Sequence, residues 1–337
     1  MSFEQGPIRP PSEARSLLVR VSRNCPWNRC VFCPAYKGQK FERRTVAEVL
    51  EDLDALKEFH GDWPRSAFLQ DADPLTTKPD DLVEILEGLR ERFPNVERIT
   101  TYARSQTLRR KPLADLRRVR EAGLDRVHVG LESGSDRVLE LIRKGVTQED
   151  HILAGARAKE AGFELSLYVM PGVGGTELTD EHADSTAQTV AAIEPHFTRL
   201  RTACAVQGTP LFEMAERGEW KPLGETETVR EIRRFLAGLE NVRMRLESDH
   251  VFNLLMHLRG DLPEDHSELL AHCDKYLELS ADDRQLFVLG RRTGRLVRVE
   301  QLDQPGVRPE LAGMLAQLDE AGHDFATTIA ELRRQIF

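Results

Sequence analysis

Short stretches in which apolar and polar residues alternate recur along residues 16–203, and longer stretches with apolar positions every three to four residues separate them. A two-residue period is typical of strands and a 3.6-residue period of helices. We predict strands at 16–22, 66–71, 97–104, 126–132, 164–170 and 197–203. We predict helices between them at 45–60, 79–93, 111–122, 134–143, 147–161 and 179–193.

The polar positions within the strands distinguish two folds. Crossovers of ten or more residues require parallel neighbours, and hence a barrel or a doubly wound sheet. In the strand at 126–132, Val127 and Leu131 share one face, whereas His128 and Glu132 share the other. Because a doubly wound sheet is covered on both faces, its strands are almost wholly apolar. The pattern therefore predicts an α/β fold, a partial (β/α)6-type TIM barrel whose open, polar interior accepts a substrate.

Beyond residue 212 the pattern becomes mostly helical. Helices are predicted at 225–239, 249–258 and 263–279, with a further strand at 242–247. We divide the chain into three parts: an extended N-terminal arm at 1–14, a barrel at 15–248, and a helical C-terminal subdomain or lid at 249–337.

Composition narrows the class of protein. The 337 residues are 40% hydrophobic and 31% charged, as in a globular enzyme with one large core. No apolar run is long enough to span a membrane and no secretory signal is recognisable, so we expect a cytoplasmic protein. A net charge of −9 argues against a general nucleic-acid-binding surface. The five cysteines do not form a disulfide framework, which agrees with a reducing compartment.

Three cysteines follow the first predicted strand. Cys25, Cys30 and Cys33 form a C-x4-C-x2-C run. A structural zinc site needs a fourth ligand, and the nearest histidine, His60, lies beyond a predicted helix. Three thiolates suit an iron–sulfur cluster that keeps one iron open for another ligand. Cys204 and Cys273 lie far from this run, and we expect both to be buried structural residues.

This run resembles the cluster motif of the radical S-adenosylmethionine (SAM) enzymes. The usual spacing in that superfamily is C-x3-C-x2-C, and one extra residue separates Cys25 from Cys30 here. The segment H-V-G-L-E-S-G-S-D at 128–136 is similar to the fourth-strand signature of the branch with oxygen-independent coproporphyrinogen oxidases and methylthiotransferases. The segment M-P-G-V-G-G-T-E at 170–177 resembles the fifth-strand segment that lies along the adenine. The resemblance covers residues 15–212.

The resemblance implies a 4Fe–4S cluster on the three cysteines, with SAM bound to its open iron. Glu132 would contact the SAM ribose, Lys144 or else Arg143 its carboxylate, and Met170 and Phe32 the adenine. The second-strand slot that binds the methionyl amine in the family holds Gln70, Asp71 and Asp73 here. Tyr102 and Arg104, on the polar strand faces, are further candidates for cofactor contacts.

The polar faces hold more arginines than one SAM carboxylate needs. Arg199 and Arg201 share a face of the sixth strand, and guanidinium groups match carboxylates and phosphates. We therefore expect a small anionic substrate beside these two residues, with Tyr168 and His250 as further catalytic candidates. Internal salt bridges are the alternative explanation of the arginines, and a helix cap is the alternative role of His250.

The resemblance implies a reaction as well. One electron, delivered by a donor such as flavodoxin or ferredoxin, reduces the cluster, and SAM is then cleaved, usually to methionine and a 5′-deoxyadenosyl radical. Three alternatives stay open: a related enzyme that transfers a methyl, methylthio or aminocarboxypropyl group, an iron–sulfur or haem carrier that has lost catalysis, and a zinc-stabilised interaction module.

Overall fold

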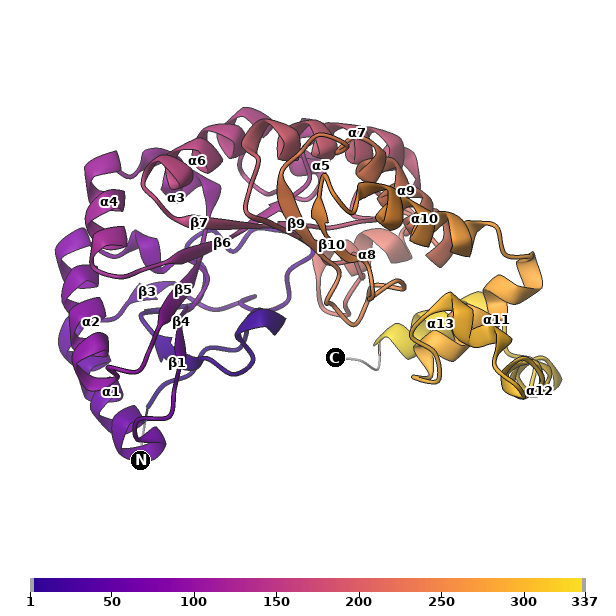
Figure 1. Cartoon of the computed structure of the whole chain (residues 1–337), viewed down its shortest axis with the longest axis horizontal. Helices are drawn as coiled ribbons and strands as arrows, with labels where there is room; N and C mark the ends of the chain where they lie inside the picture. Colours follow the sequence, from indigo (N-terminus) through magenta and orange to yellow (C-terminus); the bar gives the residue numbers. More distant parts are fainter. Residues whose placement is uncertain (1–2, 335–337) are drawn as a thin grey trace. The chain divides into compact units, whose positions relative to one another are not determined.

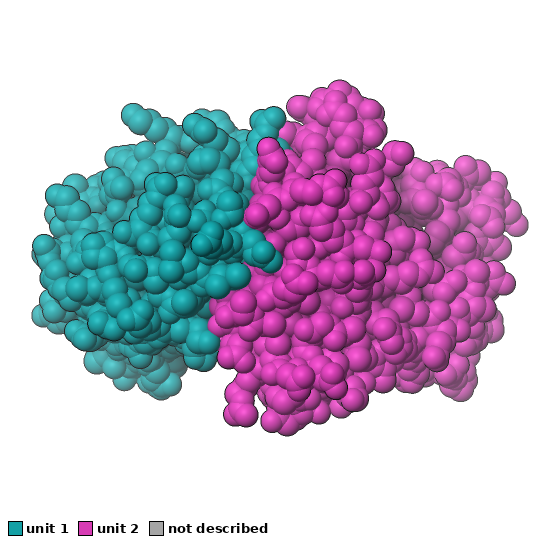
Figure 2. All heavy atoms as spheres, turned by 90° about the horizontal axis from the view of Figure 1, so that it is seen from above, with its two compact units in different colours: residues 1–131, 143–168, 195–197 teal, residues 132–142, 169–194, 198–337 magenta. Residues whose placement is uncertain are grey.

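The computed structural model of the protein describes residues 3–334, and it separates into two compact units (Figure 2). Unit 1 consists of residues 1–131, 143–168 and 195–197. Unit 2 consists of residues 132–142, 169–194 and 198–337. The predicted division into arm, barrel and C-terminal subdomain stays a prediction.

An eight-stranded sheet has the strand order β1-β4-β5-β6-β7-β8-β9-β10. The pairs β1–β4, β4–β5 and β5–β6 are parallel, and the pair β9–β10 is antiparallel. The strands are β1 Leu17–Arg20, β4 Ser66–Gln70, β5 Arg98–Ala103, β6 Arg126–Glu132, β7 Glu164–Val169, β8 Phe197–Leu200, β9 Met244–Glu247 and β10 Arg259–Leu262. A separate hairpin is formed by β2 Ser22–Arg23 and β3 Glu42–Arg43. The prediction of an α/β fold with parallel strands is confirmed.

In unit 1 the helices alternate with the strands, and Figure 1 shows α1, α2 and α4 along the outer side of β1, β4 and β5. The helices are α1 Val46–His60, α2 Pro79–Arg92, α3 Ser105–Arg110, α4 Leu113–Glu121 and α6 Gln148–Glu160. Helix α1 begins at a capping box, in which the Thr45 hydroxyl accepts a hydrogen bond from the Glu48 N–H and the Glu48 carboxylate accepts one from the Thr45 N–H. Apolar strand residues such as Val19, Leu69 and Ile99 are fully buried in the core.

Unit 2 is mostly helical. Its helices are α5 Asp136–Leu141, α7 Gly175–Ile193, α8 Pro210–Glu216, α9 Glu225–Ala237, α10 His266–Leu277, α11 Ala281–Arg292, α12 Val307–Glu320 and α13 Phe325–Arg334. Cys273 is fully buried on α10, as expected, and burial raises its pKa to about 12. Cys204 is half-buried, so the expectation that it is a buried residue is wrong. Between residues 3 and 334, no helix is long and apolar enough to cross a membrane.

The helix predicted at 249–258 is absent from the structure, which has turns there followed by β10. Side chains in this segment form hydrogen bonds with backbone groups that would be paired with one another in a helix. The Ser248 hydroxyl donates to the Leu255 carbonyl at 2.9 Å, and the Phe252 N–H donates to Nδ1 of His250 at 3.3 Å. Such side-chain bonds compete with helix formation. His250 therefore has no helix to cap, and that interpretation of it is wrong.

Candidate active site

The three predicted cluster ligands lie on the loop that joins β2 to β3 in unit 1, and all three are half-buried. Asn28, in the longer gap between the cysteines, has a left-handed backbone with φ 47°. Its N–H lies 3.4 Å from Sγ of Cys25, and its side-chain amide donates to the carbonyls of Tyr36 and Gln39. Asparagine tolerates this conformation better than most residues, so the loop turns back on itself where the extra residue occurs.

Trp27 fastens this loop to the connection between α5 and α6. Its indole N–H donates to the Arg143 carbonyl at 2.8 Å. The guanidinium carbons of Arg29 and Arg104 lie 5.0 and 5.2 Å from the centre of a Trp27 ring, within cation–π range. A Cβ at Gly145 would come within 2.2 Å of the indole, and Gly145 has φ +76°, so glycine suits this position on both counts.

Two lysines lie near the loop that carries the cysteines. The Lys37 ammonium donates to the carbonyl of Cys30 at 2.7 Å, and the Lys144 ammonium lies 5.9 Å from the Phe32 ring centre. Burial raises the pKa of Cys33, while the Ala35 N–H and the two lysines act in the opposite direction. The structure thus brings Lys144 near Phe32, which is part of the loop itself.

These residues fit an iron–sulfur cluster. The buried Tyr36 hydroxyl has no hydrogen-bond partner in the described part of the chain, and it lies within electrostatic reach of Cys33 and Cys25. Buried polar groups normally have partners, so a ligand acceptor near this hydroxyl would satisfy it. Over residues 3–334, no group of three His, Cys, Asp or Glu side chains is arranged to hold a single metal ion.

Gln70, at the end of β4, holds the N-terminal arm. Its Oε1 accepts the Gly6 N–H at 2.9 Å, and its Nε2 donates to the Ile8 carbonyl at 2.9 Å. The residue is fully buried. Both ends of the amide are thus bonded to the arm, which gives Gln70 a structural role, and its predicted cofactor contact stays a prediction.

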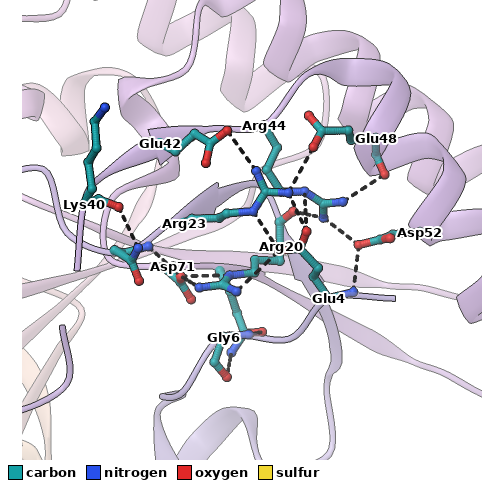
Figure 3. Close-up of polar contacts among 12 residues, drawn as sticks. Glu4, Gly6, Arg20, Arg23, Lys40, Glu42, Arg44, Glu48, Asp52 and Asp71 are labelled. Atoms are coloured by element: carbon teal, nitrogen blue, oxygen red, sulfur yellow. Dashed lines mark hydrogen bonds and ion pairs between the residues drawn. The ribbon is translucent and has the colours of Figure 1, made fainter. Parts of the chain in front are cut away.

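Asp71 links the strands to the cysteine loop. Its Oδ2 accepts hydrogen bonds from Arg20 at 2.7 Å and from the Asn24 N–H at 2.8 Å (Figure 3). Asn24 directly precedes Cys25. Burial raises the pKa of Asp71, and the bonds from Asn24 and Arg20 oppose that rise. Asp73 is fully buried, its pKa is raised to about 6 by burial, and it accepts the Thr107 hydroxyl at 2.6 Å.

An arginine network completes this end of unit 1 (Figure 3). Glu4 of the arm pairs with Arg20 and Arg23, and its N–H donates to Asp52 of α1 at 3.0 Å. Arg44, almost fully buried, donates to the same Asp52 at 2.5 Å. Internal salt bridges to Glu4 and Asp71 thus balance the charge of Arg20.

The other polar strand residues of unit 1 form a layer of rings. Tyr102 packs edge-on against Phe68 with centroids 5.0 Å apart, and His128 lies 6.2 Å from Tyr102 and 6.1 Å from Tyr168. His128 and Tyr168 are buried, and Nε2 of His128 lies 3.4 Å from Oε1 of the buried Glu13. The predicted polar face is therefore present, and much of it is buried against other protein groups.

In unit 2, Glu132 ends β6 with a backbone that non-glycine residues seldom adopt. Its φ is 62°, its side chain is buried, and its carbonyl accepts the Met170 N–H at 2.9 Å. Holding a non-glycine residue at a positive φ costs free energy, and such residues cluster at functional sites. Two residues predicted to contact SAM, Glu132 and Met170, are therefore adjacent.

The two arginines of the sixth strand have different surroundings. Arg199 is buried and donates to Asp249 at 2.6 Å, whereas the half-buried Arg201 has no ion pair among the residues described. Burial, reinforced by the charge of Arg201, lowers the pKa of His250 to about 3. His250 is therefore neutral, and because Nδ1 accepts the Phe252 N–H, its proton is on Nε2.

Asn253 holds this group together. Its Oδ1 accepts the N–H and the hydroxyl of Thr202, both at 2.9 Å, and its Nδ2 donates to the carbonyl of Leu200 at 2.8 Å. The loop with Asp249 and His250 is thereby fixed against the end of β8. Three of the predicted site residues, Arg199, Arg201 and His250, therefore lie near one another in unit 2, and their role in binding a substrate stays a prediction.

Comparison with known proteins identifies the class. The family description of the radical SAM superfamily matches residues 19–190, which include all three cysteines of the loop and Glu132, Lys144 and Met170. The chain belongs to the radical SAM superfamily, and it is an enzyme of that superfamily. The iron–sulfur cluster and SAM are the cofactors that membership implies.

The particular relatives differ in activity. An uncharacterized methyltransferase of Pyrococcus horikoshii is 28% identical over 204 residues, 59% of this chain and 41% of the relative. The cobalamin-dependent SAM radical enzyme OxsB superposes with a TM-score of 0.53 and 16% identity, covering 95% of this chain and 54% of OxsB. Coproporphyrinogen III oxidase of Escherichia coli superposes with a TM-score of 0.50 and 19% sequence identity, covering 67% of this chain and 54% of the oxidase. These two superpositions show the fold, and with the parallel strands they confirm the predicted partial barrel class.

The chain spans only part of the curated relatives that it matches, between 21% and 41% of their lengths. The family match thus establishes the superfamily of this chain, whereas its substrate and particular reaction are proposed below.

Proposed function

We propose that this chain binds a 4Fe–4S cluster through Cys25, Cys30 and Cys33 and cleaves SAM reductively to start radical chemistry on a small anionic substrate. The observation that carries the proposal is the loop itself, with three thiols within nine residues inside the segment that matches the superfamily. The bound cluster supplies the electron and the open iron on which this chemistry depends.

The residues of the chain have positioning roles in this proposal. Trp27 and Asn28 keep the cysteines in one conformation, and Lys37 and Lys144 favour thiolates and other negative groups nearby. Glu132 and Met170 are the proposed contacts to the nucleoside of SAM, and Lys144 the proposed contact to its carboxylate. Tyr102 and Arg104 stay candidates for cofactor contacts.

Arg201 and His250 are the proposed contacts to the substrate. Arg201 offers a guanidinium whose charge no described carboxylate neutralises, and Nε2 of the neutral His250 offers a hydrogen-bond donor. Both groups suit a carboxylate or a phosphate ester. Arg199 contributes less, because Asp249 already balances its charge. Tyr168 stays a catalytic candidate, and a one-electron donor such as flavodoxin or ferredoxin stays the proposed protein partner.

Binding and cleavage are tested separately. After anaerobic reconstitution, Glu132→Ala should bind SAM more weakly by about 1–3 kcal/mol, the usual cost of a lost charge-assisted hydrogen bond, and should keep its iron. Normal SAM affinity in this variant would contradict the ribose contact. With a candidate substrate, Arg201→Gln should abolish turnover but leave slow SAM cleavage, whereas loss of both activities would contradict a substrate role.

A second candidate function is methyl transfer, which the name of the Pyrococcus horikoshii relative favours. SAM carrying a labelled methyl group distinguishes the two functions, because methyl transfer moves the label into the product and hydrogen abstraction does not. The assay should be run with and without added cobalamin, since OxsB is described as cobalamin-dependent.

A further inference from the structure

A buried polar network lies in the apolar interior of unit 2, and it consists of Ser133, His182 and Glu231. Their exposed fractions are 0%, 1% and 4%. Ser133 follows β6, His182 lies on α7 and Glu231 on α9. Nδ1 of His182 lies 2.8 Å from Oγ of Ser133, and its Nε2 lies 3.6 Å from Oε1 of Glu231.

The hydrogen bonds give the network one direction. Because Nε2 of His182 faces the Glu231 carboxylate, Nδ1 is the acceptor, and the hydroxyls of Ser133 at 2.8 Å and Thr186 at 3.3 Å donate to it. The Ser135 N–H in turn donates to Oγ of Ser133 at 3.0 Å. With Nδ1 as acceptor, the proton of a neutral His182 is on Nε2, facing Glu231. The Glu231 carboxylate accepts hydrogen bonds from the Gly172 N–H and the Thr179 hydroxyl, both at 2.6 Å, whereas its 3.6 Å separation from Nε2 of His182 is an ion-pair distance.

Packing alone does not require this carboxylate. The buried face of α9 is otherwise mostly apolar, with Val229, Ile232, Phe235 and Leu236. Beside Glu231 and His182 there is a cavity of about 10 Å³, room for one water molecule at most. A buried charge in such surroundings is costly unless it is fully bonded, and polar networks of this kind fix one arrangement of the elements that they join.

The network joins the two segments proposed to bind the nucleoside of SAM. At one end, Ser133 directly follows Glu132, whose φ of 62° makes its orientation dependent on its neighbours. At the other end, Glu231 holds the N–H of Gly172, two residues beyond Met170, in a loop where Gly172 itself has φ 83°. Helix α9 thus contacts the Met170 segment directly through this carboxylate and reaches the Glu132 segment by way of His182 and Ser133.

We propose that Glu231 is a positioning residue that, directly through Gly172 and by way of His182 and Ser133, sets the Glu132 and Met170 segments in the arrangement that binds the nucleoside of SAM. The inference rests on the proposed function, since it takes the nucleoside contacts from there. It adds a residue far outside the segment that matches the superfamily, which ends at residue 190.

The test compares Glu231→Gln with a control on the same helix. Glutamine has the shape of glutamate, but an NH2 group replaces one of the two acceptor oxygens and faces hydrogen-bond donors such as the Gly172 N–H or the Thr179 hydroxyl. We therefore expect SAM to bind about tenfold more weakly, with unchanged iron content. Ile232→Val removes one methylene from the wall of the cavity and should lower the melting temperature without changing the SAM dissociation constant. Both are measured by calorimetry on the anaerobically reconstituted full chain, well below either melting temperature.

Each outcome is decisive. Normal SAM affinity in Glu231→Gln overturns the proposal, and so does an equal loss of affinity in Ile232→Val, since the effect would then be one of packing. A selective loss in Glu231→Gln, accompanied by a smaller loss in Ser133→Ala, supports it. Normal affinity in Glu132→Ala would refute the ribose contact of the proposed function, a result distinguishable from normal affinity in Glu231→Gln.

Discussion

Replacing Trp27 should loosen the loop that carries the cysteines. The indole N–H bond to the Arg143 carbonyl contributes about 0.5–1.5 kcal/mol, and each of the two cation–π contacts about 0.5–1 kcal/mol at this half-exposed site. Trp27→Ala removes all three, a sum of about 1.5–3.5 kcal/mol. At 1.4 kcal/mol per factor of ten, the loop should open about tenfold to three-hundredfold more often.

Iron release to a chelator measures this opening. Reconstituted Trp27→Ala should lose iron faster by the factor given, while Trp27→Phe, which keeps a ring but lacks the N–H, should lose it only about two- to tenfold faster than the native protein. Hydrogen exchange of residues 24–39 in the protein without iron gives the same comparison independently of the cluster. Unchanged rates for Trp27→Ala in both measurements would refute the anchoring role.

Three further predictions concern stability and iron content. Arg199→Gln should lower the free energy of unfolding by about 1–2 kcal/mol, because it leaves Asp249 without its partner; equal stability in urea titrations would show that the pair contributes nothing. Burial lowers the pKa of His151 to about 3, so the unfolded chain takes up a proton below pH 6.5 that the folded chain does not, and stability falls as the pH falls. Between pH 7 and pH 5, the free energy of unfolding of His151→Asn should therefore fall by about 2 kcal/mol less than that of the native protein. An identical pH dependence of the two proteins would contradict the buried neutral imidazole. Cys273→Ser should keep its full iron content, and iron loss at constant stability would disprove the structural assignment of that thiol.

Local patterns predicted the elements of unit 1 well. The strand at 126–132 coincides with β6 because its alternation is uninterrupted, and α1 follows the predicted 45–60 because Thr45 and Glu48 form a capping box. The helix predicted at 111–122 is in fact preceded by a further one, α3, and the sequence gives little sign of it because the alternation of β5 runs directly into it. The turns at 249–258 were missed because their bonds come from side chains.

The site was predictable where its residues are neighbours in sequence. The C-x4-C-x2-C run marks the cysteine loop, and the match to the superfamily confirms the family that this run indicates. The roles of Gln70 and Arg199 were not predictable in the same way, because their partners Gly6 and Asp249 lie 64 and 50 residues away. Trp27 was also missed, since only the folded chain brings Arg143 to its indole.

The central claim is that Cys25, Cys30 and Cys33 hold a cluster that cleaves SAM. The most direct test is mass spectrometry of SAM and its cleavage products after anaerobic incubation of the reconstituted protein with dithionite, beside the variant with all three cysteines changed to alanine. The account predicts SAM cleavage that needs dithionite and is absent from the variant, which should retain almost no iron. Equal cleavage or a full iron content in the variant would contradict it.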